Sequence, residues 1–140
     1  MDEEQVKKIL IDFFIEMNKW ETDSYSMLEQ NSLDVNHVNE TFAISKVGLQ
    51  KIYDKYLTKK KRVYTTRDGS LGNPPAYNHL IENIKEVAII TKNRIVIETI
   101  KEDIIKFRNQ YVFLKEGGEW KIDNKKTYRN HKEKFESTTI

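Results

Sequence analysis

The sequence of 140 residues contains no cysteine, and this absence excludes disulfide bonds and thiolate metal sites. It has five glycines, and none of them builds the glycine-rich loop before a helix that binds phosphate groups. No stretch approaches the roughly 18 consecutive apolar residues of a transmembrane helix. The acidic start, residues 1–4, lacks the basic and apolar regions of a secretion signal. We therefore expect a soluble cytoplasmic protein with no membrane partner.

Residues for metal or nucleophilic chemistry are few and dispersed. The histidines, His37, His79 and His131, are far apart in the sequence, and none has a second histidine four residues away as in a helical zinc site. No serine lies in the strand–turn–helix motif that exposes a nucleophile. The sequence therefore predicts no metal site and selects no catalytic nucleophile.

Acid–base catalysis is harder to exclude from residue types alone. A carboxylate that faces a pocket between helix and sheet can have a raised pKa, because burial disfavours its charged form. The conceivable acids or bases are Asp54, Glu98 and Asp103, with Tyr53, Tyr77 or Tyr111 as hydrogen-bond donors. Nothing in the spacing selects one of them, so catalysis stays open as an alternative.

The sequence does have the length of one domain and many aromatic and charged residues. We expect a single domain over residues 1–140. Hydrophobic residues make up 38%, below the usual share of about 45–50%, while charged residues make up 33%, above the usual quarter or so. Because 11% of the residues are aromatic, disorder is not favoured. A small core under a highly charged surface is the expected result.

Three helices are predicted in the first half. Residues 4–20 carry apolar side chains at the i, i+3, i+4, i+7 spacing of a helix with one buried face. Residues 22–24 are of types that cap helix N-termini, so a second, shorter helix is expected over residues 24–31. Ser45 can cap a third helix, whereas residues 32–44 are polar and poorly periodic.

The second half has the character of β-strands. Residues 62–67 are rich in β-forming types, and residues 68–75 are a loop by composition. Isoleucine and valine dominate residues 84–91 and 94–100, which predicts two strands joined by a short turn. Residues 102–108 are expected to be a loop or the bent start of a strand.

The clearest local signal is a hairpin over residues 109–128. Gly117-Gly118 can adopt the positive φ angles of a tight turn without a Cβ clash. Alternation predicts that Trp120 and Ile122 share one face of the second strand. Residues 129–140 are predicted to be a polar tail.

Helices followed by about five or six mostly antiparallel strands predict the α+β class. We expect the first helix to cross the concave face of a curved sheet, with Trp120 packed near it. Large aromatic side chains are the expected lining of the core or of a conical pocket. These residues are Phe13, Trp20, Tyr53, Tyr77, Tyr111 and Trp120.

Charge is distributed unevenly along the sequence. Acidic residues predominate in residues 1–40, and the remainder carries more than the compensating positive charge, giving a net charge of +2. Such an asymmetry offers an electrostatic surface to a partner, or is balanced between neighbouring elements. The basic runs 59–62 and 121–134 suggest nucleic-acid binding, but the pI of 8.6 is below the value of about 9 or more that dedicated binders have. Nucleic acid is therefore not favoured as a partner.

Three stretches together resemble a known family. Residues 13–21 combine an aromatic pair, a methionine and a Trp-Glu end, as in its first helix. Asn73-Pro74-Pro75-Ala76-Tyr77 is similar to its Pro-Pro-x-Tyr loop. Residues 111–123, with Gly-x-Trp-Lys-Ile-Asp, resemble its closing strands. The family is the bacterial immunity proteins with the nuclear transport factor 2-like fold.

The resemblance implies a conical domain that binds and neutralises a cognate toxin of a polymorphic toxin system in the bacterial cytoplasm, without cofactor or turnover. The acidic residues Asp12, Glu16, Glu21 and Asp23 are the candidate contacts with the toxin. Members of the wider superfamily often dimerise through the sheet, so a homodimer is a further expectation. The alternative is a small-molecule-binding protein, or a lyase or isomerase that uses the conical pocket, because fold alone does not fix function.

Overall fold

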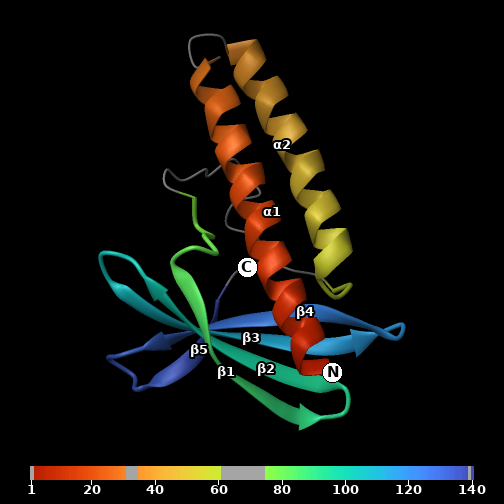
Figure 1. Cartoon of the computed structure of the whole chain (residues 1–140). Helices are drawn as coiled ribbons and strands as arrows, with labels where there is room; N and C mark the ends of the chain where they lie inside the picture. The colour runs from red at the N-terminus through yellow and green to blue at the C-terminus, as the bar shows by residue number, and fades with distance from the viewer. Residues whose placement is uncertain (1, 31–34, 61–74, 139) are drawn as a thin grey trace.

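The computed structural model describes residues 2–30, 35–60, 75–138 and 140. Within them, two helices lie on one side of a five-stranded antiparallel sheet, as Figure 1 shows. The predicted α+β class is thereby confirmed. The strand predicted over residues 62–67 and all but the last residue of the loop predicted over residues 68–75 lie outside the described residues.

The described part of the chain contains two helices, not the three predicted. Helix α1 (Asp2–Gln30) continues through residues 22–24, and α2 (Val35–Tyr56) begins well before the predicted cap Ser45. The helix break predicted near residues 22–24 was wrong, because the buried face of α1 continues beyond these residues and packs against α2. Trp20 shows the contact, since its indole Nε1 donates a hydrogen bond to the Ser45 carbonyl oxygen at 2.8 Å. Helix packing thus overrides the weak local preference for capping.

The two helices approach each other closely at Gly48 of α2. A Cβ atom at this position would lie 3.1 Å from Cδ1 of Trp20, closer than ordinary van der Waals contact. The missing side chain leaves room for the indole ring between the helices. In Figure 1 the second half of α1 and most of α2 extend together beyond the sheet.

The sheet is a simple meander in which each strand is antiparallel to the next. Its strands are β1 (Glu82–Thr91), β2 (Arg94–Glu102), β3 (Lys106–Glu116), β4 (Glu119–Arg129) and β5 (Lys134–Thr138), in that order. The predicted strands 84–91 and 94–100 are confirmed as β1 and β2. The β3–β4 hairpin is also confirmed, with φ angles of 61° at Gly117 and 80° at Gly118.

Strand β5 occupies the stretch that was predicted to be a polar tail. Its backbone pairs with β4 from Lys125↔Thr138 to Arg129↔Lys134. An aromatic contact accompanies the pairing, because the Phe135 and Tyr128 rings lie 5.3 Å apart in an edge-to-face arrangement. The tail prediction was wrong because a single aromatic residue among polar ones gives almost no periodic signal.

A β-bulge in β4 changes which residues face the helices. Val112 pairs with Asn124, whereas the next residue of β3, Phe113, pairs with Ile122, so β4 has one extra residue at Asp123. An extra residue reverses the alternation of side chains beyond it. Lys125 therefore shares the inner face, toward the helices, with Ile122.

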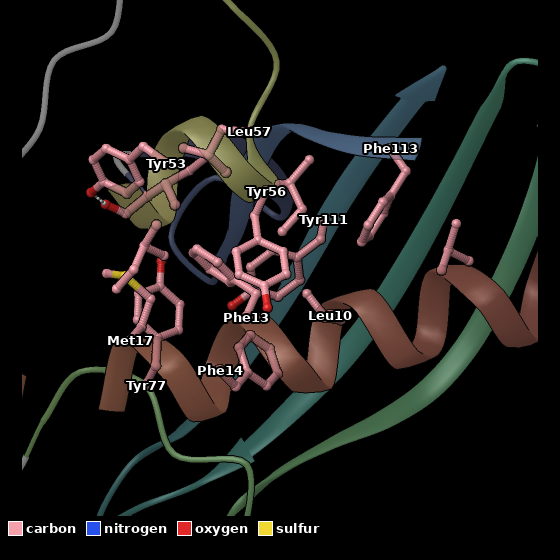
Figure 2. Packing of buried hydrophobic residues seen from close by; sticks show 14 of the residues in the cluster. Leu10, Phe13, Phe14, Met17, Tyr53, Tyr56, Leu57, Tyr77, Tyr111 and Phe113 are labelled. Carbon is pink, nitrogen blue, oxygen red and sulfur yellow. Dashed lines mark hydrogen bonds between the residues drawn. The ribbon is translucent and has the colours of Figure 1, made fainter. Parts of the chain in front are cut away.

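Aromatic side chains from both helices and the sheet fill the core (Figure 2). The Phe13 ring lies 5.3 Å from Tyr77 and 5.7 Å from Tyr56, and the Phe14 ring lies 5.4 Å from Tyr111. Edge-to-face pairs of this kind add to the free energy of apolar burial. The predicted lining residues are all buried in this one cluster: Phe13, Trp20, Tyr53, Tyr77, Tyr111 and Trp120.

Candidate functional site

A group of polar side chains is buried on the inner face of the sheet. Glu82, at the start of β1, is 4% exposed, and its Oε2 accepts a hydrogen bond from Thr99 Oγ1 at 2.6 Å. The same oxygen accepts from Asn109 Nδ2 at 3.1 Å and from the Tyr111 hydroxyl at 2.9 Å. Asn109 Oδ1 in turn accepts from Thr127 Oγ1 at 2.9 Å. We call these five residues the interior polar cluster.

Strand register brings the interior polar cluster together. Thr99 of β2 lies directly opposite Asn109 of β3, which lies directly opposite Thr127 of β4. Buried polar groups destabilise a fold unless they are hydrogen-bonded. Here donors from β2 and β3 converge on the one carboxylate of Glu82, on β1, and Thr127 of β4 joins the network through Asn109, so that all four strands are tied together.

Lys125 extends over aromatic rings beside the interior polar cluster. Its Nζ lies 4.6 Å from the centroid of the Tyr77 ring and 5.7 Å from that of Tyr111, distances typical of cation–π contacts. Burial lowers the pKa of Lys125 to about 8, with the Glu82 carboxylate opposing the shift and Lys101 adding to it. Burial also raises the pKa of Tyr77 and of Tyr111 well above 10, so both hydroxyls keep their protons.

The lowered pKa of Lys125 predicts a stability that rises with pH. Between about pH 8 and pH 10.5 the unfolded chain holds a proton that the folded chain has released, so the free energy of unfolding increases as pH rises. The gain is at most about 1.4 kcal/mol per pH unit. We expect Lys125→Met to remove this rise, as measured by urea unfolding at several pH values below 10. Lys126→Met, on the outer face of the same strand, is the control and should keep it; parallel curves for all three proteins would contradict the assignment.

The chemistry of the interior polar cluster is that of a structural network. Oε2 of Glu82 already accepts three hydrogen bonds from side chains of this chain. Among the described residues there is no group of three or more histidine, aspartate or glutamate side chains that could hold a metal ion.

A separate finding concerns the helices: neither described helix combines the length and apolar character needed to cross a membrane.

The acidic residues that the sequence offered for acid–base catalysis lie in three separate places. Glu98 is on the outer face of β2, 3.5 Å from Arg108 and 3.4 Å from Lys85. Asp103 lies in the turn after β2, and Asp54 is on the exposed side of α2. The structure does not bring these residues together.

Sequence reasoning missed Glu82 and Lys125. For Glu82 a signal existed, because strict alternation along β2 and β3 already places Thr99 and Asn109 on the buried face, where they need a hydrogen-bond partner. For Lys125 the signal was misleading. Alternation from Trp120 and Ile122 predicts that Lys125 faces outward, and only the bulge at Asp123 turns it inward.

Three of the four predicted contact residues lie along one side of α1. Asp12, Glu16 and Asp23 are separated by four and seven residues, spacings that return to nearly the same helix face. We call these three residues the α1 acidic strip. The Tyr56 hydroxyl also donates to Glu16 Oε2. Each acid has a lysine partner: Lys8 for Asp12 (2.7 Å), Lys55 for Glu16 (3.0 Å) and Lys19 for Asp23 (2.6 Å).

Glu21 is not part of the α1 acidic strip, which corrects the prediction from sequence. It is 3% exposed, and its Oε1 accepts a hydrogen bond from the Ala76 backbone nitrogen at 2.7 Å. The reason is geometric, because five residues after Glu16 correspond to about 140° around the helix axis. Glu21 thus anchors the segment before β1 instead of facing a partner.

Comparison with known proteins gives one family and one curated relative. The family model described as "NTF2 fold immunity protein" matches residues 5–138. The chain is 27% identical over 132 residues to "Immunity protein RhsIA" of Dickeya dadantii (strain 3937), covering 94% of this chain and 93% of that protein. No solved structure matches significantly.

Proposed function

Because this chain belongs to the NTF2 fold immunity proteins and is a toxin-neutralising protein, we propose that it acts in the cytoplasm by binding its cognate toxin, without catalysis. The match over residues 5–138 carries this conclusion, because it spans α1 from its fourth residue, α2 and the five strands of the described part of the chain. The interior polar cluster supports the non-catalytic part, because its carboxylate oxygen is engaged by three donors within the fold.

The α1 acidic strip is the first candidate for the toxin contact. Its residues are at the surface, with side chains that are 40% (Asp12), 38% (Glu16) and 60% (Asp23) exposed. A basic toxin surface would have to displace three lysines from these carboxylates, and exposed ion pairs of this kind contribute little either way. The α1 acidic strip is therefore one of two candidate contacts with the toxin, and the other lies at the hairpin ends of the sheet.

A homodimer through the sheet is an alternative to toxin binding by the sheet. Such a dimer would cover the outer face of the sheet in the absence of any toxin. Sedimentation of the purified chain distinguishes dimer formation from toxin binding, since toxin binding predicts a monomer that becomes part of a larger species only when toxin is added.

Co-expression tests the proposed function. We expect that cells producing the cognate toxin stop growing, and that cytoplasmic expression of this chain restores growth. The expected reason is formation of a complex, so the toxin should co-purify with the tagged chain. A catalytically inactive toxin variant that still co-purifies is the matched control. Lack of rescue by a chain that is folded, as judged by cooperative thermal unfolding, would contradict the proposal.

A further inference from the structure

A groove of about 490 Å³ is lined by residues from two hairpin ends of the sheet. The β2–β3 end supplies Ile105, Lys106, Phe107 and Arg108, and the β4–β5 end supplies Tyr128 and Arg129. In Figure 1 these ends are the cyan and dark blue loops, which spread apart at the side of the sheet away from α2. We call this feature the hairpin groove.

Arg108 is held on an aromatic platform in the hairpin groove. Its guanidinium carbon lies 4.7 Å from the centroid of the Tyr128 ring and 5.2 Å from that of Phe135. These residues alternate with the buried Asn109 and Thr127, so they belong to the outer face. The Arg108 side chain is still 41% exposed. A guanidinium fixed in this way loses little entropy when it binds a carboxylate, and arginine and tyrosine are enriched among residues that dominate binding energies.

Apolar side chains border the hairpin groove and are open to solvent. Ile105 (66% exposed) and Phe107 (39% exposed) line it, and Ile104, the chain neighbour of Ile105, is 101% exposed. All three come from the β2–β3 end of the sheet. Single exposed apolar residues are ordinary, but a cluster of three at the edge of a groove is typical of a binding surface.

The charge of the hairpin groove indicates the partner's chemistry. Lys106, Arg108 and Arg129 line it, and among the described residues no carboxylate does. Each of these cations has a carboxylate partner outside the lining, at 3.6 Å (Glu102), 3.5 Å (Glu98) and 4.0 Å (Glu136), and these ion pairs are longer than the 2.6–3.0 Å pairs of the α1 acidic strip. A second copy of this chain would bring these cations against their own copies, because a twofold contact pairs like surfaces. An acidic surface would be complementary to them.

We infer that the hairpin groove docks an acidic segment of the toxin that also carries an apolar side chain. The arginine fork binds a carboxylate, and the exposed apolar side chains at the β2–β3 end cover the apolar residue. This inference rests on the proposed function and assigns it a surface at the two hairpin ends of the sheet that lie away from α2.

Charge reversal tests the inference with the toxin against which the wild-type chain protects. Lys106→Glu/Arg129→Glu reverses two exposed cations of the groove. We expect the dissociation constant of the variant–toxin complex to be about tenfold higher or more, mainly through slower association. This dissociation constant should also depend less on salt concentration than that of the wild-type complex. Lys8→Glu/Lys19→Glu changes the net charge equally but lies on α1, and it should bind as wild type does. Ile105→Ala removes apolar contact without charge, and should weaken binding while leaving the salt dependence unchanged.

The outcomes separate the inference from the proposed function. If the wild-type chain binds and both groove variants bind equally well, the groove is not the contact and the function stands. If only the α1 variant changes affinity, the toxin contacts the α1 acidic strip and the inference is wrong. A wild-type dimer that Lys106→Glu/Arg129→Glu dissociates, or groove-dependent binding of a labelled single-stranded DNA, would also overturn it. A wild-type chain that binds no toxin overturns both.

Discussion

Replacing Glu82 with alanine should lower the free energy of unfolding by about 3–5 kcal/mol, because three buried donors lose their common acceptor. For a chain of this size the loss corresponds to a fall in Tm of about 10 °C or more. The donors come from β2 and β3, and in the variant they stay buried without an acceptor, because water does not reach them inside the core. Urea unfolding at neutral pH measures the effect directly.

Two further variants make the Glu82 prediction specific. Glu86→Ala removes the same side chain from an exposed position of the same strand and should change stability by less than about 0.5 kcal/mol. Thr99→Val removes only one of the three donors and should cost less than Glu82→Ala. If Glu82→Ala were as stable as Glu86→Ala, the interior polar cluster would not hold the sheet together.

Phe13→Ala should cost about 3–5 kcal/mol, since it leaves a cavity between α1, α2 and the sheet. The Phe13 ring is fully buried and contacts the rings of Phe14, Tyr56 and Tyr77. None of these rings can collapse into the space without leaving its other partners. Phe107→Ala removes an equal side chain that is 39% exposed, and its effect on stability should be much smaller. Equal Tm shifts for the two variants would contradict the placement of α1 on the sheet.

These two phenylalanines also separate stability from binding. Phe13→Ala should weaken protection only by lowering the folded fraction, so its folded molecules bind toxin normally. Phe107→Ala should leave the folded fraction unchanged and weaken binding at the hairpin groove. The same substitution is thus expected to lower stability at Phe13 and to weaken toxin binding at Phe107.

The sequence was sufficient where side-chain periodicity is regular. The apolar spacing of α1, the Ile and Val runs of β1 and β2, and the Gly117-Gly118 turn each depend on contacts between near neighbours in the chain. The α+β class follows from their order. These features needed no knowledge of distant residues.

The errors occurred where distant contacts decide. The expected break in α1 was absent because α2 covers its continuing face. The inward position of Glu21 follows from helix geometry, but its hydrogen-bond donor comes from the distant segment before β1. The bulge at Asp123 depends on the register with β3, which no local pattern encodes, and it determines that Lys125 points inward. The hairpin groove likewise combines two loops that are far apart in sequence.

Titration of a fixed amount of active toxin with the purified chain tests the central claim most directly. If the chain neutralises by binding alone, toxin activity should fall in proportion to the amount added and vanish near one chain per toxin, independently of incubation time. Progressive loss of activity with far less than one chain per toxin would show turnover and contradict the account.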